Sequence, residues 1–451
     1  MRILFGSEFY SPSVGGVQEV VRQLAERMVL RGHDVTVATT ALPSRQSDTL
    51  NGVKIKGFRI SGNLAHGING KVAEYRRFVE SQAFDVILIK AAQQWTFDAL
   101  WPVLADIRAR KTFIPCGFSG LYEPVYADYF ARLPNILHQF DHLIFYASDY
   151  RDINFAKRQG ITKYSIIPNG ASELEFSTEP DASFRQRHDI ASDDLLFLTV
   201  GSLGKMKGHL DVAKAFLAAD LANHPATLIL NGNEGEHIAF TSRLEVMARK
   251  AREYHRMMND IYRTEGIPSA CKYVVHGLLN KADVRLGRYA ASNYDVHIPT
   301  FRGELQKVIE DIYAQGGGKR VLLTDFSRPE LIQAYMNADL FVFASHVEYS
   351  PLVLFESAAA GTPFLSVPVG NAAEIAEWTG AGVICPAPQD ERGYTKVDPK
   401  LFGELWAHLA SDRMQLRRMG QTGRRNWAER FTWESITDRY ESIFRKVITH
   451  A

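Results

Sequence analysis

The sequence predicts an α/β protein built from two successive series of strands, loops and helices. The first series begins with the apolar run 2–5 and the second with the apolar run 195–200. In both series, short apolar strands alternate with segments whose apolar residues recur at helical spacing, which is typical of a parallel sheet. A polar stretch, 177–194, separates the two series and is interpreted as a linker with a short helix. We therefore expect two Rossmann-like domains.

Composition supports a globular protein and argues against several functional classes. The chain has 451 residues, enough for two or three domains, with 46% hydrophobic and 23% charged residues. The 52 basic residues nearly balance the 51 acidic ones, whereas a nucleic-acid-binding protein would show a basic excess. The cysteines Cys116, Cys271 and Cys385 lie far apart and form no C-x-x-C pair, which favours a reduced, cytoplasmic protein.

Membrane association is expected, if at all, only from the surface. The apolar start 1–5 is too short for a signal peptide, and no apolar run approaches the 18 or so residues of a membrane span. Two basic clusters, Arg76-Arg77 and Arg108-Arg110-Lys111, could contact the inner face of a membrane. Such basic clusters are usually solvated faces, and the sequence leaves both interpretations open.

The first series opens with a strand at 2–5, a loop ending in Gly15-Gly16 and a helix whose apolar residues begin at Val17. Gly32-His33 ends that helix before a second strand at 34–39. Glycine in a strand–helix turn lets the backbone approach a ligand closely. The loop lacks the G-x-G-x-x-G pattern, so dinucleotide binding is weakly supported. Further strands are predicted at 84–90, 112–115 and 142–147.

The second series has a strand at 195–200, a loop at 201–208 that contains Lys207, and further strands and helices. Strands are predicted at 227–231, 320–324, 339–345, 364–367 and 382–385. Helices are predicted at 331–337, 352–360 and 401–430, and an amphipathic helix follows Phe431-Thr432-Trp433 at the end of the chain.

Two glutamates flank a predicted anion site. Glu348 lies in a loop at the carboxyl end of the strand 339–345, and Glu356 lies about one turn past the start of the helix 352–360. Ligands bind at the carboxyl ends of strands in open α/β sheets, and a helix start attracts phosphate. Because carboxylates repel phosphate, we expect these two to face hydroxyl groups of the same ligand.

These residues resemble a known signature. Glu348-x7-Glu356, with Ser350-Pro351-Leu352 between the glutamates and Gly361-Thr362-Pro363 after them, resembles the retaining nucleotide-sugar glycosyltransferases of family 4, which have the GT-B fold. The loop ending in Gly15-Gly16, the Lys207-Gly208 loop and Phe431-Thr432-Trp433 extend the resemblance over nearly the whole chain.

The resemblance implies a GT-B architecture, in which two Rossmann-like domains face each other across a cleft. The acceptor domain would span 1–175, the donor domain 190–430, and the helix 431–451 would cross back to the first domain. Residues of about 234–318 are extra relative to the family and rich in helix formers. That segment would shape a partner or acceptor site, or be an inert decoration.

The resemblance also assigns roles to residues. Glu348 would contact the transferred sugar and Lys207 the donor diphosphate, and these are the predicted catalytic residues. The predicted donor-binding residues are Gly15, Gly16, Ser202, Lys207, Ser350, Pro351, Leu352 and Glu356, with Glu356 on the ribose hydroxyls. Ser202 stands where the family often has arginine, and Cys116 where many members have a catalytically important histidine. The predicted acceptor-side residues are Cys116, Gly117 and Ser119.

The leading hypothesis is therefore a retaining hexosyltransferase that uses a nucleoside-diphosphate sugar and a saccharide or lipid-linked acceptor, in surface polysaccharide or glycoconjugate synthesis. Metal dependence is not expected, because the sequence has no Asp-x-Asp and no metal-ligand spacing. One alternative is a glycosyltransferase-like protein that binds nucleotide or glycan with little turnover, which the missing arginine and histidine favour. Another is a sugar-nucleotide epimerase, against which the Glu348–Glu356 pattern counts.

Overall fold

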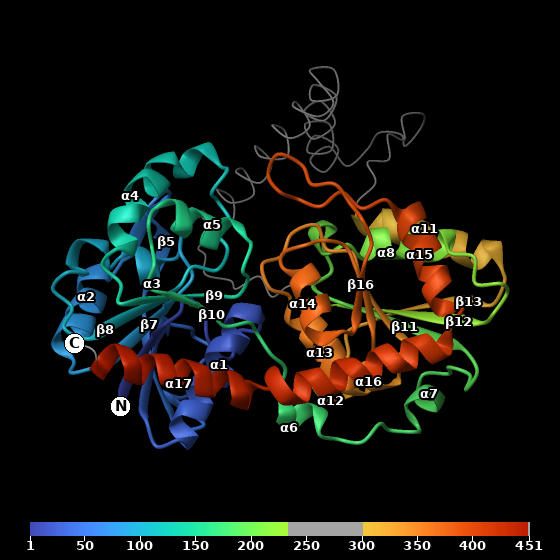
Figure 1. Cartoon of the computed structure of the whole chain (residues 1–451), viewed down its shortest axis with the longest axis horizontal. Helices are drawn as coiled ribbons and strands as arrows, with labels where there is room; N and C mark the ends of the chain where they lie inside the picture. Colours follow the sequence, from blue (N-terminus) through green and yellow to red (C-terminus); the bar gives the residue numbers. More distant parts are fainter. Residues whose placement is uncertain (233–300, 450–451) are drawn as a thin grey trace, which may run out of the picture. The chain divides into compact units, whose positions relative to one another are not determined.

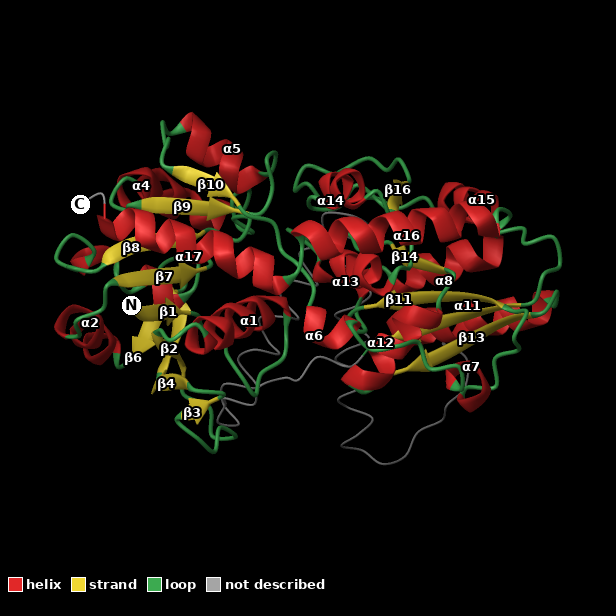
Figure 2. Cartoon of the chain, turned by 60° about the horizontal axis from the view of Figure 1, so that its bottom comes forward, coloured by secondary structure: helices red, strands yellow, loops and turns green. Residues whose placement is uncertain are grey.

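The computed structural model describes residues 1–232 and 301–449. These residues contain an eight-stranded sheet, a six-stranded sheet and a two-stranded hairpin. We call the parts built on the two large sheets the first lobe and the second lobe (Figure 1). Both large sheets are flanked by helices, as the predicted α/β class requires (Figure 2).

The first-lobe sheet has the order β10-β9-β8-β7-β1-β2-β4-β3 and is parallel except for β3. Its strands are β1 (Arg2–Gly6), β2 (Asp34–Thr40), β3 (Thr49–Leu50), β4 (Val53–Phe58), β7 (Val86–Lys90), β8 (Arg110–Ile114), β9 (His142–Phe145) and β10 (Tyr164–Ile166). Its helices are α1 (Gly16–Leu30), α2 (Val72–Ser81), α3 (Trp95–Asp98), α4 (Ala127–Leu137) and α5 (Arg151–Arg158), and the hairpin pairs β5 (Ile60–Asn63) with β6 (Gly67–Gly70).

The second-lobe sheet is wholly parallel, in the order β13-β12-β11-β14-β15-β16. Its strands are β11 (Leu195–Val200), β12 (Ala226–Asn231), β13 (Lys319–Thr324), β14 (Leu340–Phe343), β15 (Phe364–Ser366) and β16 (Gly382–Ile384). Its helices are α8 (His209–Ala218), α11 (Phe301–Gln315), α12 (Arg328–Asn337), α13 (Leu352–Ala360), α14 (Ala372–Thr379), α15 (Pro399–Ala410) and α16 (Arg413–Arg430). The short helices α6 (Glu173–Phe176) and α7 (Phe184–Arg187) lie between the two sheets in the sequence.

Burial explains why the predicted elements form. All five residues of β7 and the first five of β11 are buried, so these strands read as continuous apolar runs. The predicted helix 401–430 is interrupted, because α15 ends at Ala410 and α16 starts at Arg413. Asp412 causes the restart: its carboxylate accepts the backbone N–H of Gln415 and caps α16.

The terminal helix α17 (Trp433–Thr449) packs on the first lobe, beside α1 (Figures 1 and 2). Its buried residues, Trp433, Ile436, Tyr440 and Phe444 among them, share one apolar core with Ile3 and Phe5 of the first sheet. The predicted return of the last helix to the first lobe is therefore confirmed.

The predicted extra segment, about 234–318, lies mostly outside the described residues. Its last part forms α11, whose buried residues Leu305, Val308, Ile309 and Ile312 belong to the core of the second lobe. This part of the segment therefore covers the second-lobe sheet.

Candidate active site

The loop after β11 brings Lys207 to the carboxyl edge of the second-lobe sheet. Gly208 has a φ of 74°, and a Cβ there would lie 2.0 Å from the carbonyl oxygen of Ala344. Only glycine therefore lets the loop approach the end of β14 so closely. The His346 N–H fixes the approach by donating to the Met206 carbonyl at 2.9 Å. Lys207 is thus placed beside the loop that carries Glu348.

The two predicted catalytic residues contact each other. Lys207 Nζ lies 2.5 Å from Glu348 Oε1, and the Ser345 hydroxyl donates to the same oxygen at 3.0 Å. The Lys207 side chain is 36% exposed and the Glu348 side chain 16% exposed. The pair can therefore reach a ligand, and the carboxylate is oriented by two donors.

The start of α13 offers a place for an anion. The first turn of a helix leaves backbone N–H groups without partners inside the helix. The Ser350 hydroxyl oxygen is buried there and has no hydrogen-bond partner within the described chain. Pro351 and Leu352 complete the turn, and a Cβ on Gly16 would lie 3.7 Å from Leu352 Cδ1. The predicted Gly15-Gly16 loop therefore lies next to the start of α13.

Glu356 lies on α13 and is only 8% exposed. Its Oε1 accepts from Arg328 Nη2 at 2.6 Å, and the same nitrogen lies 2.7 Å from Glu175 Oε2. Burial alone would lower the pKa of Arg328, but the carboxylates of Glu356 and Glu175 raise that pKa well above its ordinary value. Sequence reasoning missed Arg328. The available signal was a basic residue at the start of a helix, where the dipole disfavours a cation.

Cys116, at the acceptor-side position, points into the first lobe. Its thiol accepts from Lys90 Nζ at 3.3 Å, and the same ammonium donates to the Tyr146 hydroxyl. Lys90 is 2% exposed, and burial lowers its pKa, whereas burial raises the pKa of the Cys116 thiol. Sequence reasoning missed Lys90 as the partner of this cysteine, because it lies on a different strand.

The other predicted acceptor-side residues follow Cys116 in the loop after β8. The Gly117 N–H donates to Asp152 Oδ2 at 2.8 Å, and burial raises the pKa of Asp152 to about 6. Ser119 is exposed, and its hydroxyl donates to Gln93 Oε1 at 3.3 Å. Ser119 is therefore the one of the three whose side chain is open to solvent.

Tyr349, which sequence analysis did not single out, ties the Glu348 loop to the first lobe. Its hydroxyl accepts the Tyr146 N–H at 3.0 Å, and its ring stacks on Tyr146 with centroids 5.2 Å apart. The Tyr150 hydroxyl donates to the Glu348 carbonyl at 2.6 Å, and Asn169 Nδ2 donates to the Ser350 carbonyl at 3.0 Å. The backbone on both sides of Tyr349 is therefore held by first-lobe side chains.

A second pair of carboxyl groups lies in the first lobe. Glu8 follows β1, and burial, with the nearby Asp98, raises the pKa of Glu8 to about 7. Burial raises the pKa of Asp98 to about 6, although the Tyr129 hydroxyl at 2.8 Å and the Leu64 N–H at 2.9 Å favour its charged form. In the part of the chain that the structure describes, the Glu8 carboxylate has no hydrogen-bond donor and no basic partner. Its charged form is consequently poorly stabilised.

Several predicted features lie apart from this site or are bonded elsewhere. Ser202 is exposed in the loop before Lys207. In the basic clusters, Arg76 donates to the Ala99 carbonyl at 2.6 Å, Arg110 lies 3.2 Å from Asp141, and Lys111 donates to the Ile107 carbonyl at 3.1 Å. These three basic side chains are therefore engaged within the first lobe.

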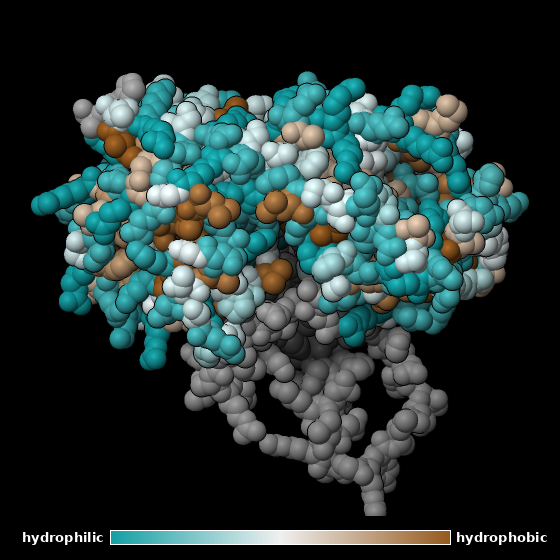
Figure 3. All heavy atoms as spheres, turned by 90° about the horizontal axis from the view of Figure 1, so that it is seen from below, coloured by the Kyte–Doolittle hydropathy of each residue, from teal (hydrophilic) through white to brown (hydrophobic). Residues whose placement is uncertain are grey.

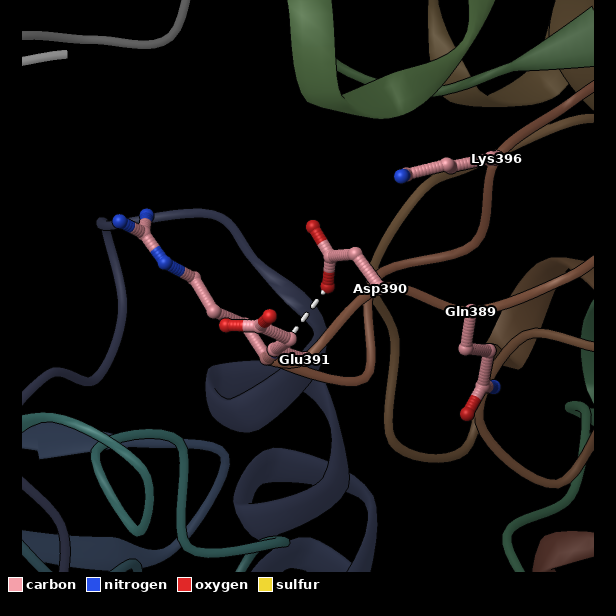
Figure 4. Close-up of a pocket in the computed structure, with 5 residues that line it drawn as sticks. Gln389, Asp390, Glu391 and Lys396 are labelled. Atoms are coloured by element: carbon pink, nitrogen blue, oxygen red, sulfur yellow. Dashed lines mark hydrogen bonds between the residues drawn. The ribbon is translucent and has the colours of Figure 1, made fainter. Parts of the chain in front are cut away.

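The surface carries a further hollow of about 380 Å³ in the loop after β16 (Figure 4). It is lined by Gln389, Asp390, Glu391, Arg392 and Lys396, side chains of both charge signs. None of the predicted site residues lines it.

The described residues provide neither a membrane-spanning helix nor a cluster of metal ligands. Among residues 1–232 and 301–449, no helix has the length and apolar character to cross a membrane. The same residues contain no group of three or more His, Cys, Asp or Glu side chains arranged to hold a metal ion. On the face shown in Figure 3, hydrophobic residues lie in small groups among hydrophilic ones.

Two family models match the chain. The model described as Glycosyltransferase Family 4 matches residues 14–172, and the model described as Glycosyl transferases group 1 matches residues 300–399. The second range contains Glu348, the start of α13 and Glu356. The chain belongs to the GT-B-fold glycosyltransferases. The recognition made from the Glu348–Glu356 pattern is confirmed at this level.

One curated relative is similar to part of the chain. The D-inositol 3-phosphate glycosyltransferase of Saccharomonospora viridis is 28% identical over 119 residues, which are 26% of this chain and 25% of that protein. The match thus spans a quarter of the relative's length.

Two solved structures match the chain over at least 99% of its length. Sucrose-phosphate synthase of Thermosynechococcus elongatus has a TM-score of 0.65 and 16% identity, with 100% of both chains covered. HepE of Anabaena, solved in complex with UDP-glucose, has a TM-score of 0.63 and 14% identity, with 99% of this chain and 100% of that chain covered. At these identities the likeness establishes the fold.

Proposed function

We propose that this glycosyltransferase moves a hexose from a nucleoside-diphosphate sugar to a saccharide or lipid-linked acceptor, with retention of anomeric configuration and without a metal ion. The observation that carries the proposal is the contact between Lys207 and Glu348 beside the start of α13. A cation, a helix start and an oriented carboxylate together suit a diphosphate attached to a sugar. HepE, a structural neighbour, was solved with UDP-glucose, which supports a donor of this class.

In the proposed reaction, the sugar–phosphate bond breaks and negative charge develops on the leaving diphosphate. Lys207 and the backbone N–H groups at the start of α13 stabilise that charge, which lowers the barrier. The anomeric carbon acquires oxocarbenium character, and the Glu348 carboxylate holds the hydroxyls of the transferred sugar. Glu356 accepts from the ribose hydroxyls. The acceptor binds on the first lobe, where Ser119 is exposed after β8.

A second candidate is a protein that binds nucleotide or glycan with little turnover. The observation that favours it is the state of Cys116, whose thiol is bonded to the buried Lys90 ammonium and stands where many relatives have histidine. Turnover through the Lys207–Glu348 pair would show that this position is dispensable for the chemistry. For either candidate we propose a cytoplasmic protein that would work at a membrane only from its surface.

The test is a thermal-shift panel of UDP, GDP, ADP and their common sugar conjugates, followed by a transfer assay with the responding donor. A ligand at about 100 times its Kd stabilises the fold by about 2.7 kcal/mol, an easily measured shift. Selective stabilisation with turnover supports the transferase, and stabilisation without turnover supports the second candidate. No response to any nucleotide contradicts the transferase and favours the second candidate in its glycan-binding form.

A further inference from the structure

Arg328 occupies an unfavourable position that its two carboxylate partners explain. It is the first residue of α12, where the positive end of the helix dipole disfavours a cation. Its Nη2 lies 2.6 Å from Glu356 Oε1 and 2.7 Å from Glu175 Oε2, and its Nε donates to Glu175 Oε1 at 3.1 Å. The planar guanidinium thus joins α12 to both α13 and α6.

Glu356 depends on this arrangement because it is a buried carboxylate. Only 11% of its side chain is exposed, and a buried charge is stable only when it is paired and hydrogen-bonded. Within the described ranges, Arg328 is the basic residue that forms an ion pair with Glu356. The guanidinium consequently supplies the positive charge and fixes the direction of Oε1.

Resting on the proposed function, we propose that Arg328 is the positioning residue that presents the Glu356 carboxylate to the ribose hydroxyls of the donor, and thereby gives the site its preference for a ribonucleotide. An ionised carboxylate offers both oxygens as acceptors, but it accepts from the ribose hydroxyls only if it faces them. Arg328 fixes that direction through its contact with Oε1. Glu175 holds the other side of the guanidinium, which a single ammonium in its place could not bridge in the same way.

The experiment compares the affinity of the full-length protein for UDP, GDP and ADP with its affinity for the corresponding 2′-deoxynucleoside diphosphates. Isothermal titration is carried out on the wild type, Arg328→Gln, Arg328→Lys and the control Arg187→Gln. Arg187 on α7 forms an ion pair, at 3.1 Å, with Glu330, which lies on the same helix α12 as Arg328. Its ion pairs within the described residues do not include Glu356.

We expect the wild type to prefer the ribonucleotide by about 10-fold or more, the size of a hydrogen bond to a charged group. Arg328→Gln should reduce that preference to within about twofold by weakening ribonucleotide binding, and Arg328→Lys should give an intermediate value. Arg187→Gln should keep the full preference. If Arg328 positions Glu356, its replacement removes the preference for ribose. A general loss of stability would instead weaken the binding of the ribonucleotide and the deoxyribonucleotide equally.

Other outcomes overturn the inference. A wild type without ribose preference, or an Arg328→Gln variant that keeps it, would show that Arg328 does not act through Glu356. If Arg328→Gln fails to fold by circular dichroism, Arg328→Lys decides: an unchanged preference overturns the inference and a reduced one supports it. Absence of all nucleotide binding in the wild type overturns the proposed function too, whereas tight binding with an unaltered preference overturns this inference alone.

Discussion

Replacing Glu348 by glutamine should separate donor binding from catalysis. In the free protein Lys207 Nζ lies 2.5 Å from the Glu348 carboxylate, so an incoming diphosphate must compete with that carboxylate for the ammonium. Glutamine keeps the shape of the side chain but removes the negative charge. Lys207 is then released, and the repulsion between Glu348 and the diphosphate disappears.

The expected changes in affinity and turnover can be estimated from the solvent exposure of the Lys207–Glu348 ion pair. With 36% of the Lys207 side chain and 16% of the Glu348 side chain exposed, the ion pair contributes about 1 kcal/mol. Its removal should tighten the binding of a free nucleoside diphosphate about fivefold. Turnover should nevertheless fall by about 10²–10³, the cost of one lost electrostatic contact in the transition state.

Isothermal titration with the nucleoside diphosphate tests the predicted gain in affinity. Initial-rate measurements with its sugar conjugate test the predicted loss of turnover. Glu377→Gln on α14 is the matched control, because Glu377 is exposed and should change neither quantity. Weaker nucleoside-diphosphate binding by Glu348→Gln would refute the competition between carboxylate and diphosphate. A loss of turnover below fivefold would remove Glu348 from the mechanism.

Two further predictions concern stability. The pKa of Glu8 is about 7 in the fold against 4.5 ordinarily, so its contribution to stability is present below pH 4.5 and is lost as the pH rises through 7. Glu8→Gln should therefore stabilise the protein by about 3 kcal/mol at pH 8 and by less than about 1 kcal/mol at pH 5. A melting temperature that differs from that of the wild type by the same amount at both pH values would contradict this pH dependence. Gly117→Ala should cost at least about 1 kcal/mol more than Gly32→Ala in urea unfolding. Both glycines have positive φ, but a Cβ on Gly117 would lie 2.9 Å from the Tyr150 ring, whereas one on Gly32 meets nothing within 4 Å. Equal losses of unfolding free energy in the two variants would show that the aromatic rings move aside without an energetic penalty.

Local patterns carried most of the fold prediction. The predicted ranges 195–200 and 352–360 coincide with β11 and α13, because buried parallel strands and an apolar helix ended by Gly361 leave strong local signals. Weaker signals were missed: the hairpin of β5 and β6 is short and glycine-rich, and the break before Asp412 depends on one capping side chain. Such features depend on single contacts that apolar periodicity does not record.

The candidate site was only partly predictable for the same reason. Lys207 and Glu348 could be assigned to one donor site from the family resemblance, but the ion pair between them was not predicted. The partners Arg328, Lys90 and Tyr349 could not be assigned, because each meets its target from another element of the fold. The proposed roles of Ser202 and Ser119 remain predictions.

By itself, the sequence determined the α/β class, the two successive sheets and the position of the Glu348–Glu356 pair, since these depend on local periodicity and spacing. Its resemblance to the GT-B glycosyltransferases came from a set of short motifs along the chain. Only the tertiary structure decided which charges neutralise the buried Glu356, where the Cys116 thiol points and how the Glu348 loop is held. Those properties arise from distances and burial between residues on different elements, which are 28 residues apart for Arg328 and Glu356 and 203 residues apart for Tyr146 and Tyr349, and no local pattern encodes such distances.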